Sequence, residues 1–269
     1  LFQQIINDGL KNKVNQRDCL DLLLNMREDF SFSENKEVRD YAMKISKYAH
    51  EMAGYMAAQT GSGEFDELYW KYLLLEAPEV FESYILYMEK NRADSKKFYI
   101  PRQKTLHIVA KDLQDLEDRI IEFYGLSMPS RVGKSTMCIF FMSWVMGKRP
   151  NSHSAMGGHS GKLAKGFYGE LLNLIETREY TYSEIFPQSK LQKKSADDFE
   201  INLDKPDRFA TMTCRGIEGT WTGAVDISSD GYLYVDDLVR DRQHSLSPSR
   251  LEGTYQEYLN KMVDRKIDG

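Results

Sequence analysis

The sequence has few cysteines, and their spacing matches no common cysteine motif. Its 269 residues include three cysteines, Cys19, Cys138 and Cys214, which lie far apart. An odd number of cysteines without a CxxC pair argues against a disulfide framework and against a zinc site. We therefore expect a protein of a reducing compartment such as a cytoplasm.

Long apolar runs and an excess of positive charge are also missing. The longest apolar run, from Met137 to Met146, is interrupted by Ser143 and is too short to span a bilayer. The N-terminus shows no basic stretch followed by an apolar one, so we expect no secretion signal and no membrane partner. The net charge of −5 excludes a protein that binds nucleic acid through overall basic charge, but a local basic patch stays possible.

The N-terminal part of the chain has the periodicity of helices. Apolar residues recur at steps of three and four between Val38 and Met52, which predicts an amphipathic helix that Ser33 would cap. The run Gly61-Ser62-Gly63 interrupts this pattern, and a second helical stretch follows it. The polar stretch from Asn91 to Lys97 resembles a linker or an exposed turn. We predict a helical N-terminal region over residues 1–95 and a second domain over residues 96–269.

From about Leu106 onward, short apolar runs alternate with longer helical patterns. This alternation predicts an α/β fold with a mostly parallel sheet flanked by helices. The expected strands are Ile120–Leu126, Ser154–Gly157, Phe209–Thr213, Ala224–Ile227 and Tyr232–Val235. The expected helices are Lys134–Met146, Ser160–Ile175 and Pro248–Lys266.

The segment Ser127–Thr136, Ser-Met-Pro-Ser-Arg-Val-Gly-Lys-Ser-Thr, follows an apolar run and precedes a strong helical pattern. This context is that of a Walker A phosphate-binding loop, in which main-chain N–H groups at a helix N-terminus face the phosphates of ATP. Gly133 would let the main chain curl closely, Lys134 would reach the β- and γ-phosphates, and Ser135 would bind Mg²⁺. The general pattern begins with Gly, whereas Met128 stands at that position. The alternative is a coincidental Gly-Lys-Ser at a helix start.

A second motif, Gly231–Asp237, is an apolar strand that ends in two acids, as a Walker B strand does. Asp236 would hold Mg²⁺, and Asp237 would polarise the attacking water as a general base or as an orienting group. Taken alone, such a strand end is common, and its acids can equally cap a helix or close a turn.

In combination, these motifs resemble the large terminase subunits of tailed bacteriophages, which drive DNA packaging. Many members of that family replace the first Gly of the loop and carry an Arg within it, as in Met128–Ser135. A subset ends the acidic strand in Asp-Asp and continues with a charged run and a capped helix, as in Val235–Asp241 and Ser245–Pro248. The Gly-rich segment Thr213–Gly223 is similar to the stretch before that strand in the same subset.

The resemblance implies a P-loop ATPase core that assembles as a homo-oligomeric ring at a capsid portal in the host cytoplasm and translocates double-stranded DNA. The portal protein and the small terminase subunit are the implied protein partners, and ATP and Mg²⁺ are the implied cofactors. The resemblance also implies a C-terminal nuclease of ribonuclease-H type, which we expect to be absent from this chain together with the coupling motif. The nucleotide would contact the loop residues Pro129, Ser130, Arg131, Val132, Gly133, Lys134, Ser135 and Thr136.

Several further residues have both a functional and an ordinary interpretation. By the resemblance, Arg131 would touch the γ-phosphate or sense hydrolysis, or it would only shield phosphate charge from the surface. Gln103 would read the adenine edge, as an upstream Gln does in some terminases, or it would only be solvated. An arginine that reaches the nucleotide of a neighbouring subunit would be Arg215, Arg240 or Arg242, although each can equally be a solvated or structural residue.

Other polar residues point less clearly to chemistry. His153 and His159 flank Gly157-Gly158 and suggest a metal site only weakly, so turn histidines are the better interpretation. Lys162 and Lys165 could meet DNA phosphates or form a charged helix face. Lys190, Lys193 and Lys194 are predicted to lie in an exposed loop, where they could contact DNA. Two further functions stay open, which are a nucleotide-binding P-loop scaffold without turnover and a helicase-like ATPase.

Overall fold

The computed structural model describes residues 4, 7, 16–31, 33–205 and 207–265 of the chain. It divides into two compact units, Leu1–Met88 and Glu89–Gly269, which are described separately here. None of the helices in the described ranges has both the length and the apolar character needed to cross a membrane.

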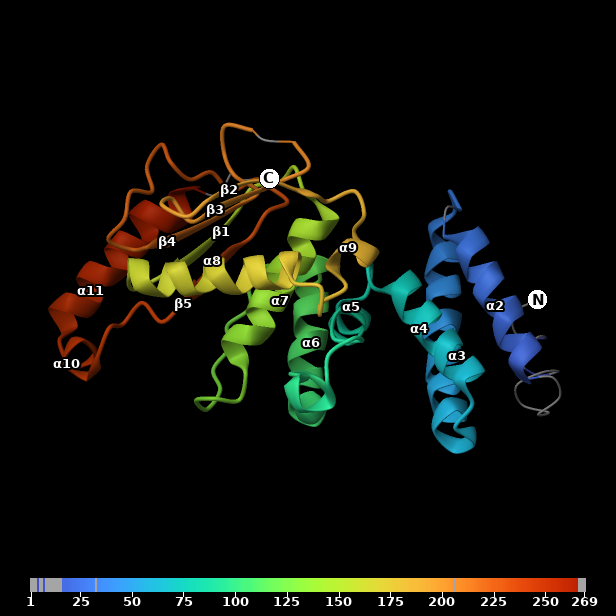
Figure 1. The fold of residues 1–269 in the computed structure, drawn as a ribbon. Coiled ribbons are helices and arrows are strands. Elements are labelled where there is room, and N and C mark those ends of the chain that lie inside the picture. The colour runs from blue at the N-terminus through green and yellow to red at the C-terminus, as the bar shows by residue number, and fades with distance from the viewer. Residues whose placement is uncertain (1–3, 5–6, 8–15, 32, 206, 266–269) are drawn as a thin grey trace. The chain divides into compact units, whose positions relative to one another are not determined.

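The first unit is helical, as the periodicity predicts. Its helices are α2 (Gln16–Phe30), α3 (Lys36–Thr60), α4 (Gly63–Glu76) and α5 (Phe81–Met88). Figure 1 shows α2, α3 and α4 side by side as a bundle. Their buried faces share a core that includes Leu20, Leu23, Ala49, Leu68 and Tyr72.

Both ends of α3 are capped, although not as predicted at its start. Asn35, and not Ser33, is the N-cap, because its side chain accepts a hydrogen bond from the N–H of Glu37. Ser33 lies two residues before the N-cap and instead accepts a hydrogen bond from the N–H of Asn35. At the other end Gly61 adopts φ 64°, the left-handed conformation that commonly ends a helix, and its N–H donates to the carbonyl of Ala57.

The boundary between the units falls between Met88 and Glu89, whereas the sequence predicts it near residue 95. The buried carboxylate of Glu89 accepts the main-chain N–H groups of Phe98 and Tyr99 at 2.7 and 2.8 Å. These bonds hold residues 89–99 together as part of the second unit. The predicted linker contains a single 3₁₀ turn, η2 (Asp94–Lys96), and a second one, η3 (Ile100–Arg102), follows it.

The second unit is built on a five-stranded sheet of order β2-β3-β4-β1-β5. The strands are β1 (Ser154–Gly158), β2 (Leu191–Ser195), β3 (Glu200–Leu203), β4 (Met212–Gly216) and β5 (Leu233–Asp236). β1 pairs in parallel with β4 and with β5, whereas β2, β3 and β4 pair in antiparallel fashion. The fold is therefore α/β with a mixed sheet, and the prediction of a mostly parallel sheet is wrong, because a hairpin extends one side.

The strand predictions are closest for the two parallel strands β1 and β5. β1 and β5 match their predicted ranges within a residue, and β4 is displaced along the chain from Phe209–Thr213. The predicted strand Ile120–Leu126 is an irregular segment without ladder pairing, and Phe123 within it is 79% exposed. The predicted strand Ala224–Ile227 is mostly irregular, with an isolated bridge at Ile227. The expected loop at Lys190–Lys194 contains strand β2 instead.

Helices cover the sheet and carry the residues of interest. α6 (Gln103–Glu117) precedes the irregular segment, and α7 (Lys134–Lys148) and α8 (Gly161–Glu176) match the predicted helices. α7 is buried along nearly its whole length, as expected for a helix that is apolar all round. α8 packs along β1 and β4, and Figure 1 shows it (yellow) lying across the strands. A short α9 (Tyr182–Ile185) follows.

Opposite faces of β1 meet different partners. A Cβ at Gly158 would approach Leu163 of α8, whereas a Cβ at Gly157 would approach Met262 and Trp221. These last two side chains belong to a second apolar cluster with Ala155 and Ile227. Because successive residues of a strand face opposite sides, the sheet is covered on both of its faces around β1.

The C-terminal helix is less regular than predicted. After a short α10 (Arg242–Ser245), α11 spans Pro248–Glu257 and starts after Ser247 with proline in its first turn, as expected. The chain then forms the wider π-helical turn η4 (Tyr258–Met262) and the 3₁₀ turn η5 (Val263–Arg265). The wider turn brings Met262 into the cluster with Trp221. Lys266, the predicted last residue, lies outside the described residues.

Candidate active site

The predicted phosphate loop joins the irregular segment to α7, which starts at Lys134. Gly133 has φ 108°, which L side chains rarely adopt, and a Cβ at that position would lie 2.5 Å from Cε2 of Phe98. Arg131 also has a positive φ, 67°, and it is exposed. The loop therefore curls before the helix, and the sequence provides glycine where both the conformation and the space require it.

β5 ends next to the start of α7, so that its last residue meets the first two residues of the helix. The hydroxyl of Ser135 donates to Oδ2 of Asp236 at 2.6 Å, and Nζ of Lys134 lies 3.4 Å from Oδ1 of the same carboxylate. The structure thus brings Asp236 to Lys134 and Ser135, which precede it by more than a hundred residues in the sequence. The ladder neighbour of β5 is β1, and the segment before the loop, Ile120–Leu126, is not a strand of the sheet.

The surroundings of Asp236 keep it ionised. Its side chain is 11% exposed, and burial alone would raise its pKa. The hydrogen bond from Ser135, the nearby hydroxyl of Tyr234 and the charge of Lys134 outweigh burial, so the pKa of Asp236 lies below its usual value. The hydroxyl of Tyr234 and the thiol of Cys138 stay protonated in the same neighbourhood. Burial and the charge of Asp236 raise the pKa of Tyr234, and burial raises the pKa of Cys138 to about 12.

A metal ion would find few protein ligands here. Among the described residues, no group of three or more His, Cys, Asp or Glu side chains lies close enough to hold a metal. Ser135 and Asp236 present a hydroxyl and a carboxylate, which are hard oxygen donors. Mg²⁺ commonly uses one or two such groups, fills the rest of its octahedron with water and substrate phosphates, and needs no protein cage. The two residues therefore fit Mg²⁺ and do not fit a structural zinc site.

Asp237 follows Asp236 in a different conformation. Its φ is 52°, in the left-handed region, and its side chain is 62% exposed. Nδ1 of His159 lies 2.8 Å from its main-chain carbonyl oxygen and 3.9 Å from its carboxylate oxygen Oδ2. Asp237, the residue after Asp236, is therefore accessible to solvent, as a group that activates water needs to be.

The two histidines around Gly157-Gly158 do not form a pair. His153 precedes β1 and lies 3.2 Å from Oδ2 of Asp226, whereas His159 follows the same strand. A five-residue strand separates them. A metal site that uses both histidines is excluded by this arrangement.

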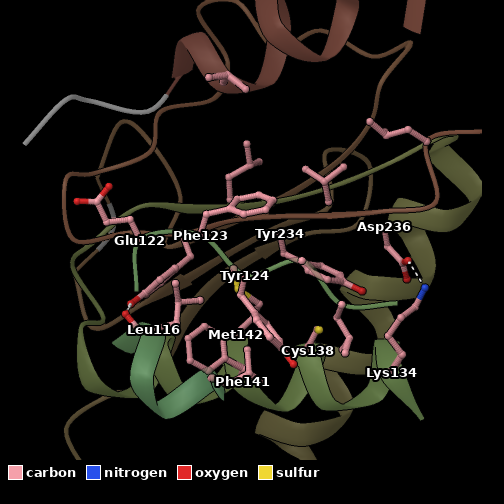
Figure 2. Close-up of a pocket in the computed structure, with 18 of the residues that line it drawn as sticks. Leu116, Glu122, Phe123, Tyr124, Lys134, Cys138, Phe141, Met142, Tyr234 and Asp236 are labelled. Carbon is pink, nitrogen blue, oxygen red and sulfur yellow. Dashed lines mark hydrogen bonds and ion pairs between the residues drawn. The ribbon is translucent and has the colours of Figure 1, made fainter. Parts of the chain in front are cut away.

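A cavity of about 470 Å³ extends from the Lys134–Asp236 pair along β5. Figure 2 shows Lys134 and Asp236 facing each other at one end and Glu122 and Phe123 at the other. Its remaining lining comes mostly from apolar and aromatic side chains of α6, α7 and β5 and of the C-terminal turns. The candidate site is thus an ionic cluster at one end of an apolar cavity, as in many small-molecule sites.

The other predicted site residues are not gathered at this cluster. Gln103 is the first residue of α6 and is exposed, where the sequence suggested a loop. Arg215 lies on β4 and donates to Oε1 of Glu200 at 3.0 Å within the same chain. Arg240 and Arg242 are exposed between β5 and α10 and at the start of α10. Their proposed reach to a neighbouring subunit stays a prediction.

Sequence reasoning missed the environment of the two aspartates. Tyr234 precedes Asp236 by two residues, so the period of a strand could have placed both on one side of β5. His159 could have been found from the pairing of β1 with β5, since the residue after each strand leaves the sheet at the same edge. The pairing itself is not visible in a single sequence.

No protein-family model matches this chain, and no curated protein matches it. The functional argument therefore rests on the residues and their geometry.

Proposed function

We propose that this chain is the ATPase part of a large terminase subunit, which hydrolyses ATP to drive double-stranded DNA into a phage capsid. The observation that carries the proposal is the meeting of Lys134, Ser135 and Asp236 at the N-terminus of α7, within 3.4 Å of one carboxylate. This is the arrangement expected of a P-loop NTPase core, in which a phosphate loop and an acidic strand end face each other.

In this proposal each residue acts through position and charge. Main-chain N–H groups from Ser130 to Lys134, at the positive end of the α7 dipole, bind phosphate oxygens. Lys134 neutralises the β- and γ-phosphates, and Ser135 and Asp236 hold Mg²⁺. When bound, Mg²⁺ supplies charge neutralisation between the phosphates. Asp237 orients the water that attacks the γ-phosphate and accepts its proton.

The assignment to DNA packaging rests on the sequence motifs. Arg131 within the loop, the Asp236-Asp237 pair and the segment Thr213–Gly223 together resemble large terminases. Arg131 is exposed and held at φ 67°, so it is available to a γ-phosphate. We accordingly propose the portal protein, the small terminase subunit and double-stranded DNA as partners, and a ring of several copies in the host cytoplasm as the working state.

Phosphate release from ATP tests the proposal most simply. We expect Mg²⁺-dependent release by the natural chain, which rises when double-stranded DNA is added. Lys134→Ala is expected to abolish binding and release, whereas Asp237→Asn is expected to bind ATP and to keep only a slow but measurable residual release of phosphate. Lys111→Ala, on an exposed part of α6, serves as the matched loss of a lysine and is expected to leave release unchanged. Equal turnover by all four proteins would refute the proposed site.

Two features favour a second function, a nucleotide-binding scaffold without turnover. The segment before the loop, Ile120–Leu126, is not a strand of the sheet, and Met128 replaces the usual glycine. The first leaves the loop without a sheet strand on its N-terminal side, and the second makes the start of the loop stiffer than glycine would. ATP binding without any phosphate release, with DNA and portal protein present, would support the scaffold against the motor.

A further inference from the structure

His159 and Asp237 occupy equivalent places at the ends of two neighbouring strands. β1 and β5 run in parallel, and their register pairs Gly158 with Asp236. His159 and Asp237 are the next residue of each strand and leave the sheet at the same edge. The contact between them therefore follows from the pairing of the edge strand β5 with β1 and not from a flexible loop.

The bond between the two residues goes to the main chain of Asp237. A carbonyl oxygen can only accept, so Nδ1 of His159 must carry the hydrogen in the 2.8 Å contact. The 3.9 Å separation from Oδ2 of the same residue is too long for a hydrogen bond. His159 therefore fixes the backbone of Asp237 and leaves the carboxylate available to solvent.

The backbone that is fixed in this way is an unusual one. Asp237 has φ 52°, a left-handed conformation that is unfavourable for L residues, although less so for Asp than for most others. A change to the more common negative φ would swing the Cα–Cβ bond and turn the carboxylate in another direction. The direction of the Asp237 carboxylate relative to Lys134 and Asp236 thus depends on what holds its main chain.

We propose that His159 is a positioning residue for Asp237, which it holds in the left-handed conformation through its Nδ1–H···O=C hydrogen bond. The proposal rests on the proposed ATPase function, in which Asp237 activates water. A carboxylate that accepts a proton must point at one water molecule, because proton transfer needs hydrogen-bond geometry. His159 supplies that direction without touching the nucleotide.

Steady-state ATPase assays on two substitutions test this role. His159→Ala removes the donor and is expected to lower kcat at least about tenfold while KM stays within about twofold. His159→Asn keeps an N–H donor near the place of Nδ1 and is expected to restore kcat to within about threefold of the natural chain. His153→Ala, at the other end of β1, is the matched control and is expected to leave kcat unchanged. Loss of kcat in both His159 variants, or in neither, would overturn the proposal.

A double-substitution cycle separates positioning from a general structural role. If His159 acts only through Asp237, then His159→Ala in an Asp237→Asn background causes no additional loss of kcat. A further tenfold loss in that background would contradict the proposal.

A nucleotide-free measurement distinguishes failure of this proposal from failure of the proposed function. The ¹⁵N NMR shifts of the His159 ring report which nitrogen carries the hydrogen in the neutral form. We expect the Nδ1–H tautomer in the natural chain without ATP. A neutral ring protonated only at Nε2 would overturn the proposal whether or not the chain hydrolyses ATP. Absence of ATP binding together with the Nδ1–H tautomer would refute the proposed ATPase function but not the hydrogen bond from His159 to the carbonyl oxygen of Asp237.

Discussion

Replacing Gly133 by alanine tests the phosphate loop where its geometry is most demanding. The added Cβ meets two obstacles, which are the positive φ of 108° and the ring of Phe98 at 2.5 Å. The ring has little room to move, because it stacks on the buried Phe140 with centroids 5.9 Å apart, and the guanidinium of Arg102 lies over it. The loop, and not the ring, must therefore change.

The cost follows from these two terms. A left-handed conformation costs an L residue roughly 1–2 kcal/mol, and an added carbon in a packed site costs about 1–3 kcal/mol. Gly133→Ala should thus destabilise the second unit by roughly 2–5 kcal/mol, which corresponds to a fall in Tm of roughly 5–15 °C. If the chain relaxes by flattening the loop, part of the stability returns, but the main-chain N–H groups no longer converge on phosphate.

The assay combines thermal unfolding with calorimetric titration of Mg·ATP. Gly166→Ala, inside α8, is the control, because a Cβ there meets nothing within 4 Å. Since alanine favours a helix more than glycine does, this control should stabilise the chain by about 0.5–1 kcal/mol. A Gly133→Ala protein with the Tm and the ATP affinity of the natural chain would refute the account of the loop.

Three further predictions concern groups around the sheet. Hydrogen bonds from Arg149 and Lys148 outweigh burial and lower the pKa of Glu117 from 4.5 to about 2. The ionised side chain should therefore contribute about 3 kcal/mol to the free energy of unfolding. This contribution should be complete above pH 4.5 and should be lost as the pH falls toward 2. Acid titration of unfolding should show this loss, and Glu117→Gln should remove it. The thiol of Cys138, which is buried and whose pKa is raised to about 12, should react with a thiol reagent only as fast as the chain unfolds; rapid labelling of the native protein would contradict its burial. Arg215→Ala should lower Tm by a few degrees through loss of its bond to Glu200; an unchanged Tm with a loss of DNA-stimulated turnover would instead support a role at a neighbouring subunit.

The parts of the fold that the sequence predicts are those with a marked apolar run or period. α7, α8, β1 and β5 are identified closely, because each has a strong pattern between clear turn residues. The sequence predicts a loop at β2, because the segment presents lysines on an exposed edge hairpin and lacks the apolar alternation of a half-buried strand. It predicts a strand for the apolar run Ile120–Leu126, although a strand also needs a partner in register, which a single sequence does not display.

The candidate site was predictable in its residues but not in its neighbours. The Gly-Lys-Ser motif and the two acids at a strand end indicate Lys134, Ser135 and Asp236, and the structure brings these three side chains together. The hydrogen bond from His159 depends on the pairing of β1 with β5, which is a property of the folded sheet. Sequence motifs therefore identify the residues of the ionic cluster, whereas the contact between His159 and Asp237 depends on the pairing of β1 with β5 in the folded sheet.

The most direct test of the central claim is calorimetric titration of the chain with ATP, with and without Mg²⁺, beside the Lys134→Ala and Asp236→Asn variants. The account predicts binding by the natural chain that Mg²⁺ strengthens, no binding by Lys134→Ala, and binding by Asp236→Asn that no longer responds to Mg²⁺. Binding that is equal in all three proteins, or no binding by the natural chain, would contradict the claim that this cluster holds a magnesium–nucleotide complex.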